Sequence, residues 1–114
     1  MSRKNTLSGA PPYAVEETIK RLGANLRTAR LRRNLTIQQV ADKIGTGPRA
    51  VMEAEKGRPG ASIAVYLALL WAYDLLDQMS DVADAVKDAE GLARLPARER
   101  ARTSRLKTRV SNDF

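Results

Sequence analysis

The sequence of 114 residues contains no cysteine and no histidine. Without cysteine the chain has no disulfide, no thiolate nucleophile and no thiolate metal ligand. Without histidine it lacks the side chain that most often acts as a general base or binds a transition metal. Any chemistry would depend on carboxylates, lysine, tyrosine and hydroxyl groups, so we expect no enzyme activity, no cofactor and no metal site.

Long apolar runs are missing as well. The longest apolar stretch extends from Ile63 to Tyr73, which is too short to cross a bilayer. The residues that follow Met1 lack the apolar core of a signal peptide. A chain of this length corresponds to one small domain, which excludes a large catalytic fold. Together these features predict a soluble cytoplasmic protein.

Basic residues outnumber acidic ones, with 20 Lys and Arg against 13 Asp and Glu and a formal net charge of +7. The excess lies in residues 1–36 and 94–114, whereas residues 62–93 carry many carboxylates and a single lysine. Because a basic chain attracts polyanions, its charge favours nucleic acid as the partner. The acidic block between the basic ends offers a separate face for a different partner.

Composition divides the chain into three parts. Residues 1–12 contain Ser, Gly and the pair Pro11-Pro12 with few apolar side chains, which is typical of a flexible arm. Residues 13–95 carry helical patterns, and residues 96–114 are expected to form a basic flexible tail. No segment alternates as a β-strand does, so the sequence predicts an all-α fold, a bundle of five helices.

Two of these helices are predicted between residues 13 and 44. Apolar residues recur at intervals of three and four along the first, which extends from Tyr13 to about Arg33. Thr36, with Gln39 three residues later, predicts a capping box at the start of a second helix, Ile37–Ile44. Gly45 is expected to end that helix.

Three further helices are predicted beyond Gly45. Gly47 and Pro48 begin a short helix that ends at Gly57. Ser62 caps a helix from Ile63 to about Leu76 that is apolar on nearly all sides, and the last helix covers about Met79–Leu92. A small domain covers only one face of such an apolar helix. The second face therefore meets either another chain or a following helix, and we expect a homodimer interface at Leu69, Tyr73 and Leu76.

The two short helices on either side of Gly45 have the spacing of a helix-turn-helix unit. Counted from Ile37, small or apolar residues occupy the fourth, fifth, eighth, fifteenth and eighteenth places: Val40, Ala41, Ile44, Val51 and Ala54. Ala41 is small where the second helix crosses close to it, and Gly45 permits the positive φ of the turn. The second helix then presents a narrow convex face that fits a major groove.

The segment LGANLRTARLRRNLTIQQVADKIGTGPRAVMEAEKG resembles the Cro/cI (Xre) family of DNA-binding domains, and the resemblance covers about residues 22–76. Other features resemble HipB-like antitoxins, which are encoded beside HipA-like kinase toxins: the Pro-Pro-Tyr arm, LLWAYDLLDQM, DAVKDAEGLA and the basic tail ending in Asn112-Asp113-Phe114. The resemblance implies a five-helix bundle that forms a homodimer, represses its own operon and binds the toxin.

The resemblance also implies a set of DNA contacts. Four residues occupy positions at which the family meets base edges: Gly47, Pro48, Arg49 and Glu53. Four others occupy positions along which phosphates pass: Gln38, Lys43, Lys56 and Arg58. A guanidinium such as that of Arg49 pairs bidentately with guanine, and a carboxylate such as that of Glu53 accepts a hydrogen bond from cytosine. Arg30 and Glu55 match a partly buried salt bridge between the first and third helices, which implies a structural role.

Two positions depart from the family pattern. The family usually has Gln where this chain has Ile37, and a polar or basic residue where it has Glu53. One phosphate contact is therefore missing and one like-charge repulsion is added. The main interpretation is a homodimeric repressor that reads a palindromic operator with residues 48–56 and serves as the antitoxin of a HipA-like kinase. The alternative is a protein-interaction module that binds a toxin without specific DNA recognition.

Three remaining groups of residues have a structural and a functional interpretation. The first is aromatic, at helical spacing in an apolar run, and indicates core or dimer packing rather than base stacking: Tyr66, Trp71 and Tyr73. The second is a set of carboxylates that indicates a solvated acidic face rather than a metal site: Asp74, Asp77, Asp81 and Asp84. The third is Phe114, which is expected to anchor the chain in a pocket of the toxin.

Overall fold

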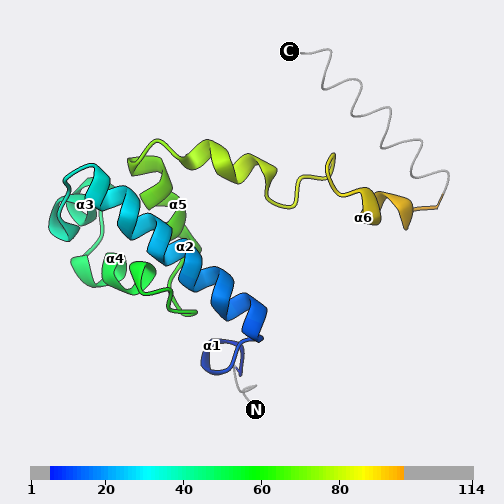
Figure 1. Cartoon of the computed structure of the whole chain (residues 1–114), viewed down its shortest axis with the longest axis horizontal. Helices are drawn as coiled ribbons and strands as arrows, with labels where there is room; N and C mark the ends of the chain where they lie inside the picture. Colours follow the sequence, from blue (N-terminus) through cyan, green and yellow to red (C-terminus); the bar gives the residue numbers. More distant parts are fainter. Residues whose placement is uncertain (1–5, 97–114) are drawn as a thin grey trace. The chain divides into compact units, whose positions relative to one another are not determined.

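The computed structural model describes residues 6–96. The described residues are helical and contain no strand, which confirms the predicted all-α fold. In chain order the elements are α1 (Thr6–Gly9), α2 (Tyr13–Arg32), α3 (Ile37–Ile44), α4 (Pro48–Glu55), α5 (Ile63–Ala72), a 3-10 helix η1 (Leu76–Asp81) and α6 (Ala89–Ala93) (Figure 1). They fall into two compact units, one up to Leu76 and one from Asp77, so the expected domain of residues 13–95 spans both.

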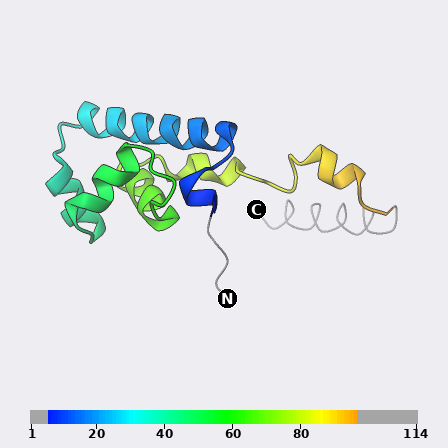
Figure 2. The ribbon, with the colours of Figure 1, turned by 90° about the horizontal axis from the view of Figure 1, so that it is seen from below.

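The first unit contains the long helix α2, which extends over the range that the apolar spacing predicted. Figure 2 shows α2 lying along one side of the unit, where it packs against α4. The single turn of α1 lies within the expected flexible arm, whose residues 1–5 are outside the described part. None of the helices within residues 6–96 is long and apolar enough to span a membrane.

The turn between α3 and α4 has the predicted chemistry. The Thr36 hydroxyl accepts a hydrogen bond from the Gln39 backbone N–H at 3.1 Å, and the Gln39 side-chain oxygen accepts one from the Thr36 N–H at 2.9 Å. Gly45 adopts a left-handed φ of 81° and donates its N–H to Ala41 O at 3.0 Å. Gly47 and Pro48 then begin α4 as its N-cap and first residue. Local sequence is therefore sufficient to end α3 at Ile44 and to begin α4 at Pro48.

The core of this unit is built from residues of the helix-turn-helix spacing. Val40, Ala41, Val51 and Ala54 are 0% exposed. Both α3 and α4 pack against α5, so α5 buries more than one of its apolar faces within its own chain. This packing fixes the first residues of α4 relative to the rest of the unit.

Helix α5 is shorter than predicted, and its own chain covers the face that was expected to form the dimer interface. It ends at Ala72 rather than near Leu76, because Asp74 adopts a left-handed φ of 58° and the Leu75 N–H bonds back to Leu70 O at 2.8 Å. The side chains of Leu69 and Tyr73 are 0% and 1% exposed, so both belong to the core and neither is free for an interface. Leu76 is 38% exposed and lies beyond α5, at the start of η1.

The predicted helix over about Met79–Leu92 is wrong. That range holds the end of η1, a set of turns and the start of α6. Its aspartates bond to nearby backbone N–H groups and so compete with a continuous helix. Asp84 accepts from the Val86 N–H at 2.9 Å, Asp88 accepts from the Gly91 N–H at 3.0 Å, and Ala83 takes a positive φ of 54°. The predicted basic tail of residues 96–114, with Phe114, lies outside the described residues apart from Pro96.

Candidate nucleic-acid interface

Helix α4 has one buried and one exposed side. Val51 and Ala54 are packed inside, whereas Pro48, Arg49 and Met52 are exposed. The guanidinium of Arg49 makes no hydrogen bond or ion pair with any residue of the 6–96 range. The arginine is exposed near the start of a helix whose opposite side is packed against the rest of the protein. Such an arginine has the geometry needed to reach a base edge.

The buried side of α4 is held by an ion pair to α2. Arg30 donates to both carboxylate oxygens of Glu55, with Nε–Oε2 at 2.7 Å and Nη2–Oε1 at 3.0 Å, and also donates to Leu35 O at 2.9 Å. The two side chains are 9% and 6% exposed. The hydrogen bond to Glu55 raises the pKa of Arg30 above its usual value. This is the structural salt bridge that the resemblance implied, and it sets the position of the C-terminal end of α4.

A close approach of α2 and the C-terminal end of α4 adds a second constraint, which the sequence analysis missed. A Cβ on Gly23 would lie 2.5 Å from Ala54 O and 2.7 Å from Glu55 O. A Cβ on Gly57, which has a φ of +69°, would lie 2.5 Å from Lys20 Cα. The available signal was Gly23 itself, because glycine in the middle of a long helix costs stability and needs a packing reason.

Two basic residues bind carbonyl groups at the C-terminal end of α5. Arg33 donates to Ala29 O and to Tyr73 O, both at 2.9 Å, and its guanidinium lies 5.5 Å from the centre of the Tyr73 ring. Lys43, a predicted phosphate contact, donates to Ala72 O at 3.4 Å and lies 5.9 Å from the Trp71 ring. Positive groups at the end of a helix also offset its dipole. These contacts give Arg33 a structural role and compete with phosphate for Lys43.

Burial of Tyr73 leaves its hydroxyl without a partner among the described protein groups. Burial raises the pKa of this phenol to about 12, with a further contribution from the negative charge of Glu55. Tyr73 is therefore a core residue with an unsatisfied polar atom and lies near the Arg30–Glu55 pair.

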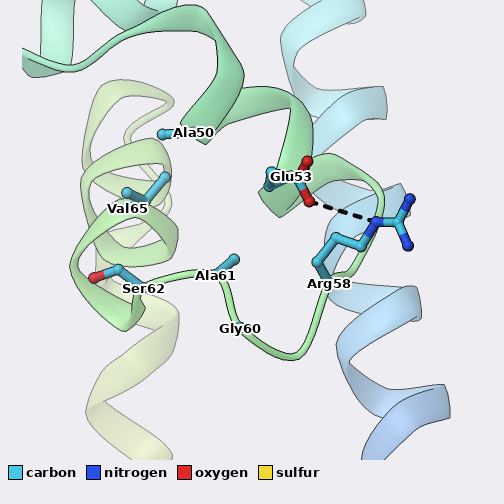
Figure 3. A pocket seen from close by; sticks show the side chains of 7 residues that line it. All are labelled: Ala50, Glu53, Arg58, Gly60, Ala61, Ser62 and Val65. Atoms are coloured by element: carbon cyan, nitrogen blue, oxygen red, sulfur yellow. Dashed lines mark ion pairs between the residues drawn. The ribbon is translucent and has the colours of Figure 1, made fainter. Parts of the chain in front are cut away.

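The other predicted phosphate contacts lie in different surroundings. Gln38 donates to Asp42 at 2.9 Å, and Lys56 is exposed at the end of α4. Arg58 forms an ion pair with Glu53, Nε–Oε2 at 3.4 Å (Figure 3). The pair lies beside a groove of about 420 Å³ between α4 and the start of α5. The structure thus brings together one predicted base contact and one predicted phosphate contact.

A second groove, of about 680 Å³, lies beside the start of α3. Its apolar lining comes from Leu31, Leu35, Ile37, Pro48 and Met52. Ile37, one of the two departures from the family pattern, therefore belongs to an apolar surface next to the exposed side of α4. The carboxylates within residues 6–96 form no cluster suited to a metal ion.

Comparison with known proteins agrees with this geometry. A family model described as a helix-turn-helix domain matches residues 21–82, which is more than half of the chain. Neither the search of curated proteins nor the search of solved structures gives a significant match. The matched range contains α3, α4 and the turn between them.

Proposed function

Because the chain belongs to the helix-turn-helix domain family of DNA-binding regulators, we propose that it is a sequence-specific repressor that reads a palindromic operator with α4. The observation that carries the proposal is Arg49, which is exposed and pairs with no residue of the described range, on a helix that the Arg30–Glu55 pair holds on its buried side. Arg49 with Gly47, Pro48 and Glu53 meets base edges, while Gln38, Lys43, Lys56 and Arg58 meet phosphates. Binding blocks the polymerase by occupying the operator.

We propose that the repressor is a homodimer whose two copies of α4 enter successive major grooves about 34 Å apart. The exposed side of α5 supports a second copy as its occupant: Ile63 and Trp71 are 63% and 54% exposed, and the helix carries no charged residue. Two copies can therefore bury apolar surface there, with Lys43, 5.9 Å from the Trp71 ring, at the edge of this surface. This surface replaces Leu69 and Tyr73, which are buried in the core.

The antitoxin role is a further part of the proposal. The resemblance to HipB-like antitoxins supports a HipA-like kinase as the protein partner, with Phe114 as an anchor. Deleting Ser111–Phe114 should weaken binding of the kinase encoded beside this chain and leave DNA binding unchanged. Unchanged affinity for the kinase in a pull-down titration would rule out the anchor.

The alternative function is a protein-interaction module without specific DNA recognition. The apolar groove at Leu31, Leu35, Ile37 and Met52 favours it, because apolar side chains there make no phosphate contact. DNase footprinting on the DNA upstream of the chain's own gene separates the two functions. A protected palindrome with half-sites one helical turn apart supports the repressor, whereas no protection at any concentration favours the interaction module.

A further inference from the structure

Helix α4 carries two glutamates whose ion pairs differ in kind. Glu55 is held by Arg30 through two short hydrogen bonds, and both side chains are nearly inaccessible. Glu53 has a single contact of 3.4 Å to Arg58, and the Arg58 and Glu53 side chains are 60% and 37% exposed. An exposed pair with one long contact is weak and exchanges partners readily. The Glu55 pair holds the helix in place, whereas the Glu53 pair controls where a surface cation lies.

The backbone of Arg58 is fixed although its side chain is exposed. Its N–H donates to Glu53 O at 3.1 Å, and its carbonyl accepts from the Ala61 N–H at 3.0 Å and from the Tyr66 hydroxyl at 3.4 Å. Figure 3 shows the guanidinium beside the Glu53 carboxylate, next to a groove lined by small residues such as Ala50 and Ala61. Only rotation of the side chain is needed to move this charge from the carboxylate to an approaching phosphate.

The two possible partners of Arg58 differ in strength. Exposed ion pairs contribute a factor of about 1.4 to 5 to an equilibrium constant. An arginine–phosphate contact is charge-assisted and often bidentate, so it can displace the carboxylate. Once Arg58 moves, Glu53 carries an unpaired negative charge on the side of α4 that faces the bases. A base amino group, N4–H2 of cytosine or N6–H2 of adenine, can satisfy that charge, whereas guanine, thymine and phosphates present acceptors and cannot.

We propose that Glu53 determines specificity by controlling Arg58: it withholds this cation from random DNA and releases it where a base amino group, that of cytosine or adenine, lies opposite the carboxylate. The inference rests on the proposed function, because it requires that α4 reads DNA. On random sequence Arg58 stays paired with Glu53, so one phosphate contact is not made. On the preferred sequence both charged groups gain partners, and the ratio of specific to random affinity increases.

The test measures duplex affinity against salt for the wild type, Glu53→Gln, Arg58→Gln and the double variant. The two probes are a random-sequence duplex and the duplex that the wild type selects from a randomised pool. Glu53→Gln should bind the random duplex about 1.4- to 5-fold more tightly, with a slope of log K against log salt steeper by about one unit. Its affinity for the selected duplex should not increase. In the Arg58→Gln background the gain on random DNA should disappear.

Glu90→Gln is the matched control, because Glu90 also pairs with an exposed arginine, Arg94, at 2.5 Å and lies outside α4. It changes the net charge by the same amount and should leave the ratio of affinities unchanged. The inference is overturned if Glu90→Gln gives the same gain, or if the gain of Glu53→Gln persists without Arg58. Failure of the wild type to bind either duplex would instead overturn the DNA-reading function.

Discussion

Four arginines of the first unit, which extends to Leu76, lie in four different environments. Arg30 is buried against a carboxylate, Arg33 joins the C-terminal ends of α2 and α5, and Arg58 is loosely paired with Glu53. Arg49 alone among these four is exposed without a hydrogen bond or ion pair in the described part of the chain. Because the side chain is the same in each case, burial and available partners decide which arginine can meet DNA.

Arg49→Ala should lower affinity for the preferred duplex by about 1–3 kcal/mol and relax preference at one base position, since a bidentate contact to guanine is lost. Lys56→Ala should weaken binding to all DNA sequences by the same factor and flatten the slope of log K against log salt by about one unit. Fluorescence anisotropy with both duplexes measures the two effects. An equal loss on preferred and random DNA for Arg49→Ala would show that it contacts a phosphate.

Glu55→Ala should destabilise the protein by roughly 3–5 kcal/mol, because it leaves the buried charge of Arg30 without its partner. Glu53→Ala is the matched control, on the same helix and with an exposed ion pair, and should cost no more than about 1 kcal/mol. Urea unfolding followed by circular dichroism gives both values. Similar losses for the two variants would contradict the structural role of the buried pair.

Tyr73 gives the molecule a specific alkaline instability. Its pKa of about 12 in the folded state lies above the ordinary value of 10, so the folded state holds the proton more tightly. The resulting stability is fully present below pH 10 and is lost as pH increases towards 12, by roughly 1–3 kcal/mol. Tyr73→Phe should remove this part of the pH dependence and be near neutral at pH 7, since it also removes an unsatisfied buried hydroxyl. Unfolding at pH 8 and pH 11 measures the difference.

At the scale of elements, the crossing of α2 and α4 depends on two glycines. Their missing side chains let the backbones touch, and the Arg30–Glu55 pair holds the same crossing from another position. An exposed helix of eight residues has little stability of its own. The direction in which α4 points is therefore a property of its packing against α2 and α5.

Gly23→Ala should destabilise the protein by about 1–3 kcal/mol, because the new methyl group would overlap backbone atoms of α4 that cannot rotate away. Where the protein still folds, the displaced α4 should also bind DNA more weakly. Gly60→Ala is the control, since a Cβ there has no atom within 4 Å. Thermal unfolding and DNA titration of both variants test this. A fully stable, DNA-binding Gly23→Ala would contradict the close packing.

For the protein as a whole, the net charge of +7 opposes association of two copies unless they meet on a mainly apolar surface. Trp71 lies on such a surface and is the only tryptophan of the chain. Its emission should shift to shorter wavelength as protein concentration increases, and light scattering should give about twice the monomer mass.

Trp71→Glu should give a monomer, because a charge on each copy would be brought into the interface. Leu31→Glu is the control: Leu31 is similarly exposed but lies on α2, beside the second groove. It should remain dimeric. A monomeric wild type at micromolar concentration would contradict the proposed dimer, and a monomeric Leu31→Glu with a dimeric Trp71→Glu would move the interface to the second groove.

Residue type and spacing were enough to predict the parts of this protein that depend on near neighbours. The capping box at Thr36, the left-handed turn at Gly45 and the Pro48 start of α4 involve atoms a few residues apart, so residue type and spacing were sufficient. The buried helix-turn-helix positions followed from the same spacing. Where local signals conflicted, as in the aspartate-rich range 79–92, periodicity alone predicted a helix that the side-chain to backbone bonds prevent.

Which surfaces are free depends on how the helices pack against one another. Leu69 and Tyr73 have the same apolar character as Ile63 and Trp71, yet the first two are buried and the last two exposed, because α3 and α4 pack on only part of α5. In the same way, Glu53 and Glu55 are alike in sequence, but only Glu55 faces Arg30 of α2. Such differences depend on contacts between residues far apart in the chain, which neither composition nor periodicity contains.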